Sequence, residues 1–130
     1  MKRLLFSFLL LITISFCFAQ QKDFSYWEKL LRTEKNFQKL IYYSNINRER
    51  VTSNYYGNDI RLIRNIDKDC FKNKPSLINC LNKAGFKKSK EFADLAFLQQ
   101  DAMLAFRKAN PEFIKLPQPT QQKLLVKYFK

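Results

Sequence analysis

The chain has 130 residues and a formal net charge of +13, because 24 lysines and arginines outnumber 11 acidic residues. It contains no histidine and two glycines. The lack of histidine removes the commonest general base and the commonest metal ligand, and two glycines are too few for a glycine-rich phosphate loop. We therefore expect a protein that is not an enzyme and that uses no cofactor or metal.

The N-terminal segment has the form of a secretory signal peptide. A short basic start precedes the apolar stretch Leu4–Phe16, and Cys17 and Ala19 place small residues where a signal peptidase requires them. We expect residues 1–19 to be removed and residues 20–130 to act in the periplasm or outside the cell. A retained membrane anchor is the weaker alternative, because the apolar stretch is shorter than the roughly 20 residues that span a bilayer. Lipid attachment to Cys17 is disfavoured by the bulky residue before it.

Two cysteines remain after the predicted signal peptide, Cys70 and Cys80, ten positions apart. Thiols of exported proteins meet an oxidising environment, so we expect one disulfide, which on chain entropy stabilises a loop of this size by about 3 kcal/mol. A redox pair would have the shorter C-x-x-C spacing, and a metal site would lack histidine ligands. The disulfide is therefore the favoured interpretation.

The rest of the pattern predicts an all-α bundle of four or five helices in a single domain. The first helix begins at Ser25, where Glu28 completes an S-x-x-E capping box, and continues to about Tyr43. Its apolar stripe contains Trp27, Leu30, Leu31, Phe37 and Ile41. Residues 44–57 lose this periodicity and are predicted to form a loop that contains at most one helical turn.

Two helices are expected around the cysteines. The first covers residues 58–72. The second begins with Pro75, whose missing N–H has no cost in a first turn, and it ends at Gly85. Phe86 then folds back on Leu81 in the manner of a left-handed helix stop.

The longest predicted helix covers residues 89–110 and ends before Pro111, which cannot continue it. Its main stripe contains Phe92, Leu95, Ala96, Met103 and Phe106. Gln99 lies inside this stripe and needs a hydrogen-bond partner if it is buried. A final short helix is predicted from a cap at Thr120, with Leu124, Leu125, Tyr128 and Phe129 turned inward.

A basic ridge is expected on the predicted helix over residues 58–72. Projected at about 100° per residue, its four cations lie within about 80° of one another. They are Arg61, Arg64, Lys68 and Lys72. The functional interpretation is an anion-binding surface, and the alternative is a solvated helix face.

An apolar pair is expected on the longest helix. Phe97 and Leu104 are seven positions apart and lie outside the main stripe, beside charged residues. They are candidates for an exposed surface that a protein partner covers. Alternatively, they pack beneath the N-terminal or C-terminal helix.

These features predict an exported, non-catalytic binding or inhibitory protein with a protein partner in the envelope or outside the cell. In overall layout, small, exported and helical, the chain resembles the periplasmic immunity proteins that neutralise wall-attacking toxins. No motif carries this resemblance, and it assigns no functional residue. The alternative is a basic protein that binds the envelope surface, a membrane surface or an anionic polymer through distributed cations. Nucleic acid is not an expected partner outside the cytoplasm.

Overall fold

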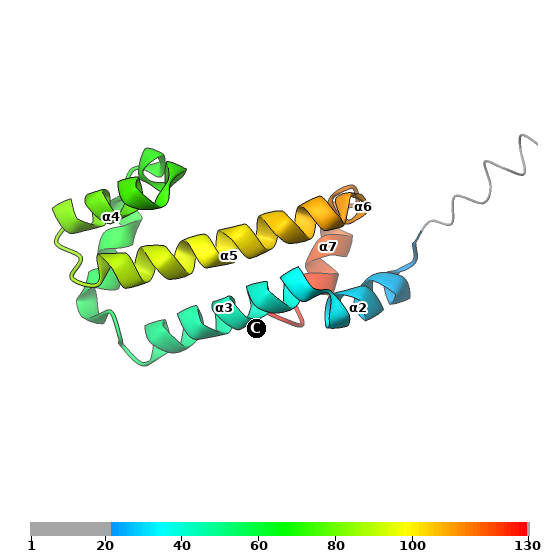
Figure 1. Cartoon of the computed structure of the whole chain (residues 1–130). Coiled ribbons are helices and arrows are strands. Elements are labelled where there is room, and N and C mark those ends of the chain that lie inside the picture. The colour runs from blue at the N-terminus through cyan, green and yellow to red at the C-terminus, as the bar shows by residue number, and fades with distance from the viewer. Residues whose placement is uncertain (1–21, 130) are drawn as a thin grey trace, which may run out of the picture.

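The computed structural model describes residues 22–129, and the predicted signal peptide at residues 1–19 lies outside them. The described part is helical and contains no strand, which confirms the all-α class (Figure 1). It has more helices than the four or five predicted. In chain order these are α2 (Phe24–Thr33), α3 (Lys35–Thr52), the 3₁₀-helices η1 (Gly57–Asn65) and η2 (Lys68–Lys72), α4 (Lys74–Lys83), α5 (Ser89–Ala109), α6 (Pro111–Ile114) and α7 (Gln118–Leu125).

Two long helices, α3 and α5, form the axis of the molecule. They lie side by side and run in opposite directions (Figure 1). The short helices gather at the two ends of this pair: α2, α6 and α7 at one end, and η1, η2 and α4 at the other (Figure 1). Each end has its own hydrophobic cluster, so the described chain is elongated and has two cores.

The first cluster, called here the aromatic core, joins α2, α6 and α7 to the helix pair. Its buried members are Trp27, Leu31, Phe37, Leu40, Ala102, Phe106, Phe113 and Leu124. Phe106 and Phe113 pack edge to face with ring centroids 5.1 Å apart, and Trp27 contacts Phe113 at 5.3 Å. Burying several aromatic side chains together stabilises a small domain strongly, because each removes a large apolar area from water.

The second cluster, called here the disulfide core, lies at the opposite end. Its buried members are Tyr56, Cys70, Leu77, Leu81, Phe86 and Ala93. Cys70 and Cys80 form the predicted disulfide, with their Cα atoms 6.1 Å apart. The predicted stop of the cysteine helix is also confirmed: Gly85 has φ +86°, and the Phe86 N–H donates to the Leu81 carbonyl at 2.9 Å. Both of these apolar side chains are buried.

The predicted first helix is wrong in its boundaries. Asp23, in place of Ser25, accepts the capping hydrogen bond, from the Tyr26 N–H at 2.8 Å. The helix then breaks at Glu34, which has extended backbone and whose carboxylate accepts from the Phe37 N–H at 2.6 Å to begin α3. A glutamate that caps a new helix ends the previous one, because its backbone must leave helical geometry.

The loop predicted for residues 44–57 is also wrong over most of its length, since α3 continues to Thr52. The segment is polar because it extends past the aromatic core. Its far end is held through Arg50, which donates to the Glu91 carbonyl at 3.3 Å and to the Tyr56 hydroxyl at 3.4 Å. Polar contacts with α5 thus hold this part of α3 in place, where the sequence has no apolar stripe.

The α-helix predicted over residues 58–72 is instead two 3₁₀-helices. Ile66 is extended between them, and the Asp67 carboxylate accepts from the Asp69 N–H at 2.7 Å to start η2. An aspartate offers the backbone this local alternative to a helical hydrogen bond. The isoleucines, Leu62 and Cys70 of the segment still turn toward the disulfide core, whereas Phe71 is exposed.

The longest helix is confirmed at residues 89–109, but its buried face differs from prediction. Met103 is 40% exposed, and the buried positions include Ala93 and Ala102. Small side chains at these positions fit the close packing of a neighbouring helix. At the C-terminus, α7 begins at Gln118 without a side-chain cap, and Phe129 remains 44% exposed.

Candidate binding pocket

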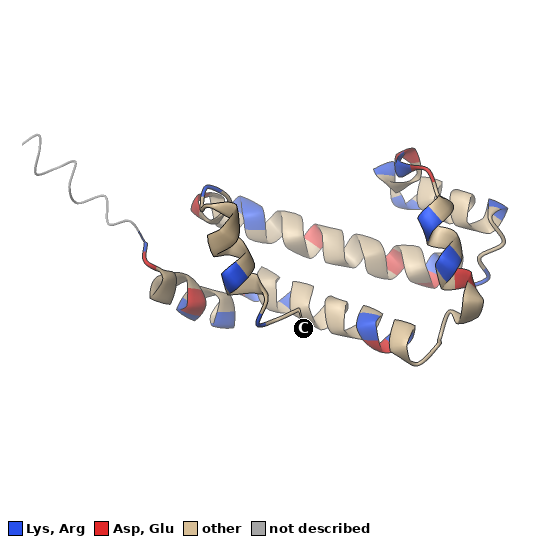
Figure 2. Ribbon diagram, turned by 180° about the vertical axis from the view of Figure 1, so that it is seen from behind, with Lys and Arg blue, Asp and Glu red and all other residues tan. Residues whose placement is uncertain are grey.

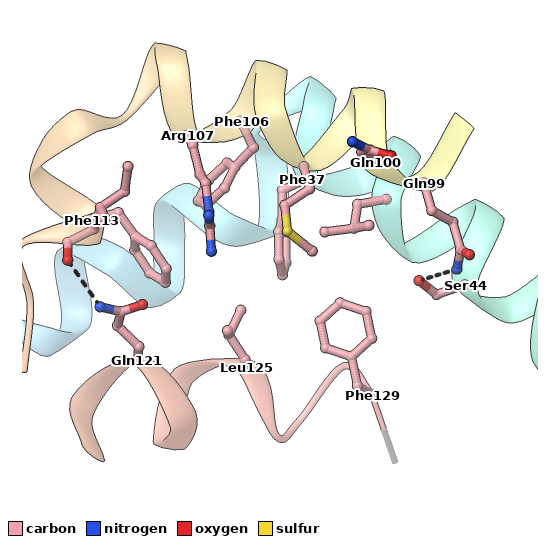
Figure 3. A pocket seen from close by; sticks show the side chains of 13 residues that line it. Phe37, Ser44, Gln99, Gln100, Phe106, Arg107, Phe113, Gln121, Leu125 and Phe129 are labelled. Carbon is pink, nitrogen blue, oxygen red and sulfur yellow. Dashed lines mark hydrogen bonds between the residues drawn. The ribbon is translucent and has the colours of Figure 1, made fainter. Parts of the chain in front are cut away.

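A pocket of about 400 Å³ opens between the helix pair and the C-terminal helices (Figure 3). Helix α5 supplies one wall with side chains at helical spacing, and α3, α6, α7 and the residues after α7 supply the others. The lining residues are Phe37, Leu40, Ser44, Gln99, Gln100, Met103, Phe106, Arg107, Phe113, Ile114, Gln121, Leu125 and Phe129. Its size lies within the range of ~300–1,000 Å³ usual for small-molecule sites.

Aromatic rings shared with the aromatic core form the base of the pocket. Phe37 is fully buried and contacts Phe106 at 5.3 Å between ring centroids. Phe129 contacts the same Phe37 ring edge to face at 6.2 Å. These rings fix the base rigidly, because Phe37 and Phe106 also pack inside the core.

Two amide side chains of the pocket are already engaged within the protein. Gln99 Nε2 donates to the Ser44 hydroxyl at 3.1 Å and joins α5 to α3 (Figure 3). This is the partner that the sequence required for Gln99. Gln121 Nε2 donates to the carbonyls of Ile114 at 3.1 Å and Leu116 at 2.8 Å, and so fastens α7 to α6.

Arg107 is the only charged side chain among the residues that line the pocket. In Figure 3 it extends from α5 across the pocket toward Leu125 on α7. It makes no hydrogen bond or ion pair with any residue in the range 22–129. Within residues 22–129, the pocket therefore combines an apolar base with an exposed guanidinium that has no ion-pair partner.

The rim of the pocket is unusually apolar for a surface. Met103 is 40% exposed, Ile114 47% and Phe129 44%. Leu104, 54% exposed, adjoins this rim on α5, because the pocket-lining Gln100 and Arg107 are its neighbours four residues before and three residues after it. A cluster of exposed apolar side chains around a concavity is typical of a binding site.

The structure does not bring together the two residues of the predicted apolar pair. Phe97 is half-buried and packs against the disulfide core. Leu104 is exposed and lies beside the pocket. Sequence reasoning missed the pocket itself, although Gln99, Met103 and Arg107 follow a spacing of four residues that marks one face of α5.

The predicted basic ridge is not one helical face. Arg61 and Arg64 lie on η1, whereas Lys68 and Lys72 lie on η2 beyond the extended Ile66. All four cations are exposed. Lys72 forms an ion pair with Asp69 at 3.2 Å. Along the described chain, basic residues occur in most elements (Figure 2).

Shifted pKa values occur outside the pocket. The Tyr56 hydroxyl, hydrogen-bonded to Arg50, raises the pKa of that guanidinium. At the start of α2, Lys22 contacts Glu112 at 2.6 Å, which raises the pKa of the lysine and lowers the pKa of the carboxyl. Both contacts connect elements of the fold, so they have a structural explanation.

Residues 22–129 contain no group of three or more cysteine, aspartate or glutamate side chains that could hold a metal ion. Within the same residues, no helix has the length and apolar character needed to span a membrane.

Comparison of the chain with protein-family models, curated proteins and solved structures found no match.

Proposed function

We propose that this protein is an exported, non-catalytic binding protein and that the pocket on α5 is its binding site. The observation that carries the proposal is an open concavity with an aromatic base and an apolar rim that nothing in residues 22–129 covers. Exposed apolar side chains cost solubility, and the presence of Met103, Ile114 and Phe129 around one concavity favours a role in recognition.

Export is supported by the signal-like first nineteen residues and by the disulfide between Cys70 and Cys80. Structural disulfides belong to oxidising compartments, whereas cytoplasmic thiols are kept reduced. The non-catalytic part of the proposal depends on side-chain chemistry, because a chain without histidine lacks the commonest general base.

A matched pair of variants on α5 tests the proposed site. Met103→Glu places a charge on the rim, and Leu98→Glu places the same charge at a position of similar exposure, 40% against 43%, which does not line the pocket. Wild-type protein and both variants are incubated with envelope extract of the source cell, and bound molecules are identified by cross-linking and native mass spectrometry. The circular dichroism spectrum verifies that each variant is folded.

We expect a ligand or partner that wild-type protein and Leu98→Glu retain and that Met103→Glu loses. Equal retention by both variants would remove the pocket from the proposal. A protein partner recovered in this way would support the interpretation that the chain is an inhibitory protein similar to the immunity proteins. That interpretation otherwise depends on the small size of the chain, its helical fold and its signal-like N-terminus.

A second candidate is a basic protein that binds an anionic envelope polymer. It is favoured by the net charge of +11 on residues 20–130 and by the exposed Arg61, Arg64 and Lys68, for which residues 22–129 offer no ion-pair partner. Binding through many cations weakens steeply with salt, whereas an apolar pocket responds little. Affinity for the recovered ligand across a salt series, in wild type and in Arg61→Glu/Arg64→Glu, distinguishes the two candidates.

A further inference from the structure

The pocket holds one positively charged side chain, the Arg107 guanidinium, and no acidic side chain of residues 22–129 lines the pocket with it. Its planar fork of N–H donors matches the oxygens of a carboxylate or a phosphate. We propose that the pocket binds a small amphipathic anion, with the acid group on Arg107 and an acyl or aryl body against the aromatic base. This inference rests on the proposed function, since it names the ligand class of the same site.

The apolar part of such a ligand has a complementary surface in the pocket. Phe37 and Phe106 form a rigid base, and Phe129 and Leu125 face them from the C-terminal side (Figure 3). An alkyl or aromatic group that enters this space removes its own apolar surface and the exposed surface of Phe129 and Met103 from water, which is the main source of affinity in sites of this kind.

The polar groups of the pocket restrict where the acid group can lie. Ser44 and Gln99 bind each other, and Gln121 is engaged by backbone carbonyls. The amides of Gln99 and Gln121 and the hydroxyl of Ser44 therefore already have hydrogen-bond partners within the protein. Arg107 and Gln100 are the lining polar side chains that form no hydrogen bond with residues 22–129, and they lie two helical turns apart on the same face of α5.

Arg107 is exposed at the pocket, so it attracts the acid group of an anion, gives a neutral apolar ligand no such contact and repels a cation. The net charge of +11 that residues 20–130 carry acts in the same direction, because it raises the local concentration of anions near the surface. Charge and shape together thus favour a ligand with one acidic end and one apolar end.

The experiment compares two amphiphiles that differ in the head group. Dodecanoate and dodecanol are titrated below micelle-forming concentrations into the exported, disulfide-bonded protein, and heat of binding is measured. Arg107→Gln removes the charge of the pocket, and Lys108→Gln is the matched control, since Lys108 adjoins Arg107 in sequence but does not line the pocket.

We expect dodecanoate to bind more tightly than dodecanol. Arg107→Gln should weaken dodecanoate binding by about 10-fold or more, because a hydrogen bond to a charged group is lost, and should leave dodecanol unchanged. Lys108→Gln should bind both amphiphiles as the wild type does. Equal affinities of the two amphiphiles, or an Arg107→Gln variant that keeps full dodecanoate affinity, would overturn the role of Arg107.

Failure of the ligand class is distinguishable from failure of the pocket. If neither amphiphile binds while Met103→Glu still abolishes capture from the envelope, the pocket serves a protein partner and the inference is wrong, although the proposed function stands. Phosphatidylglycerol vesicles identify the source of the anion: co-sedimentation that Arg107→Gln abolishes indicates a membrane lipid, and dodecanoate binding without co-sedimentation indicates a free acid.

Discussion

Gln99 on α5 donates a hydrogen bond of 3.1 Å to the Ser44 hydroxyl on α3, and this contact joins the two long helices where the pocket ends. We predict that Ser44→Ala lowers the free energy of unfolding by about 1 kcal/mol, because the half-buried amide loses its partner. Gln99→Leu should cost less, since an apolar side chain suits an apolar wall. Urea unfolding of both variants and the double variant gives the coupling energy. A Ser44→Ala protein as stable as wild type would contradict the prediction.

The second prediction concerns the disulfide core. Cys70→Ser/Cys80→Ser should lower the free energy of unfolding by about 2–4 kcal/mol and leave a helical circular dichroism spectrum. Because the aromatic core at the opposite end does not contain these cysteines, amide exchange should accelerate in η2 and α4 more than in α2 and α7.

Uniform acceleration of exchange along the whole chain would show instead that the two cores unfold as one unit. The comparison therefore measures how far the helix pair couples the two ends.

The third prediction uses the different surroundings of Phe97 and Leu104. Phe97→Asp should destabilise the fold by several kcal/mol, because it places a charge against the disulfide core. Leu104→Asp should leave stability within about 0.5 kcal/mol of wild type, since this side chain is 54% exposed. The thermal midpoints of the two variants provide the measurement. Comparable destabilisation by both would show that Leu104 is buried under a part of the protein outside residues 22–129.

The fourth prediction is a pH dependence at the start of α2. The Lys22 ammonium lowers the pKa of Glu112, so the pair stabilises the fold above the ordinary range of a glutamate and loses this contribution as pH falls through the lowered pKa. The pKa of Lys22 is raised, so the contribution disappears again as pH rises through that value. The effect is small because both groups are exposed.

The difference in unfolding free energy between wild type and Glu112→Gln, measured over a pH series, should therefore be largest at intermediate pH and vanish at both extremes. With no histidine in the chain, the difference should be flat between about pH 5 and 8. A Lys22→Gln variant should give the same profile. If the difference in unfolding free energy between wild type and Glu112→Gln does not change with pH, the contact between Lys22 and Glu112 has no electrostatic role.

The fifth prediction concerns the exported form. We expect its N-terminus at Gln20 and no titratable thiol, because the signal peptide removes Cys17 and the remaining cysteines are paired. Intact mass and thiol titration of material from the source cell decide this. A retained N-terminus or a lipid on Cys17 would contradict it.

The elements that sequence reasoning placed correctly are those delimited by local backbone chemistry. Pro75 and Gly85 delimit α4, and Pro111 follows the end of α5. The proline ring and its missing N–H, and the missing side chain of glycine, constrain the backbone within a few residues, so their effect can be predicted from the sequence. Sequence reasoning did not predict the helix break at Glu34. A glutamate between apolar helical positions looks like an ordinary helix residue, and only the structure shows that its carboxylate accepts from the Phe37 N–H and begins a new helix.

The candidate site was less accessible to prediction. The sequence identified Leu104 but paired it with Phe97, because helical projection alone treats both as one face. Packing separates them: the disulfide core covers Phe97 and ends before Leu104 is reached. The same reasoning placed Met103 in the core, whereas the structure places it on the rim of the pocket.

The sequence by itself determined that this chain is helical and that Cys70 pairs with Cys80, because helical periodicity and a short loop between thiols are properties of neighbouring residues. Only the tertiary structure decided that Arg107 lies in an apolar pocket. Its walls come from α3, α5, α6 and α7 and from Phe129, segments far apart along the chain. Their side chains converge because the aromatic core holds these helices together at one end of the molecule, and no local pattern encodes that convergence.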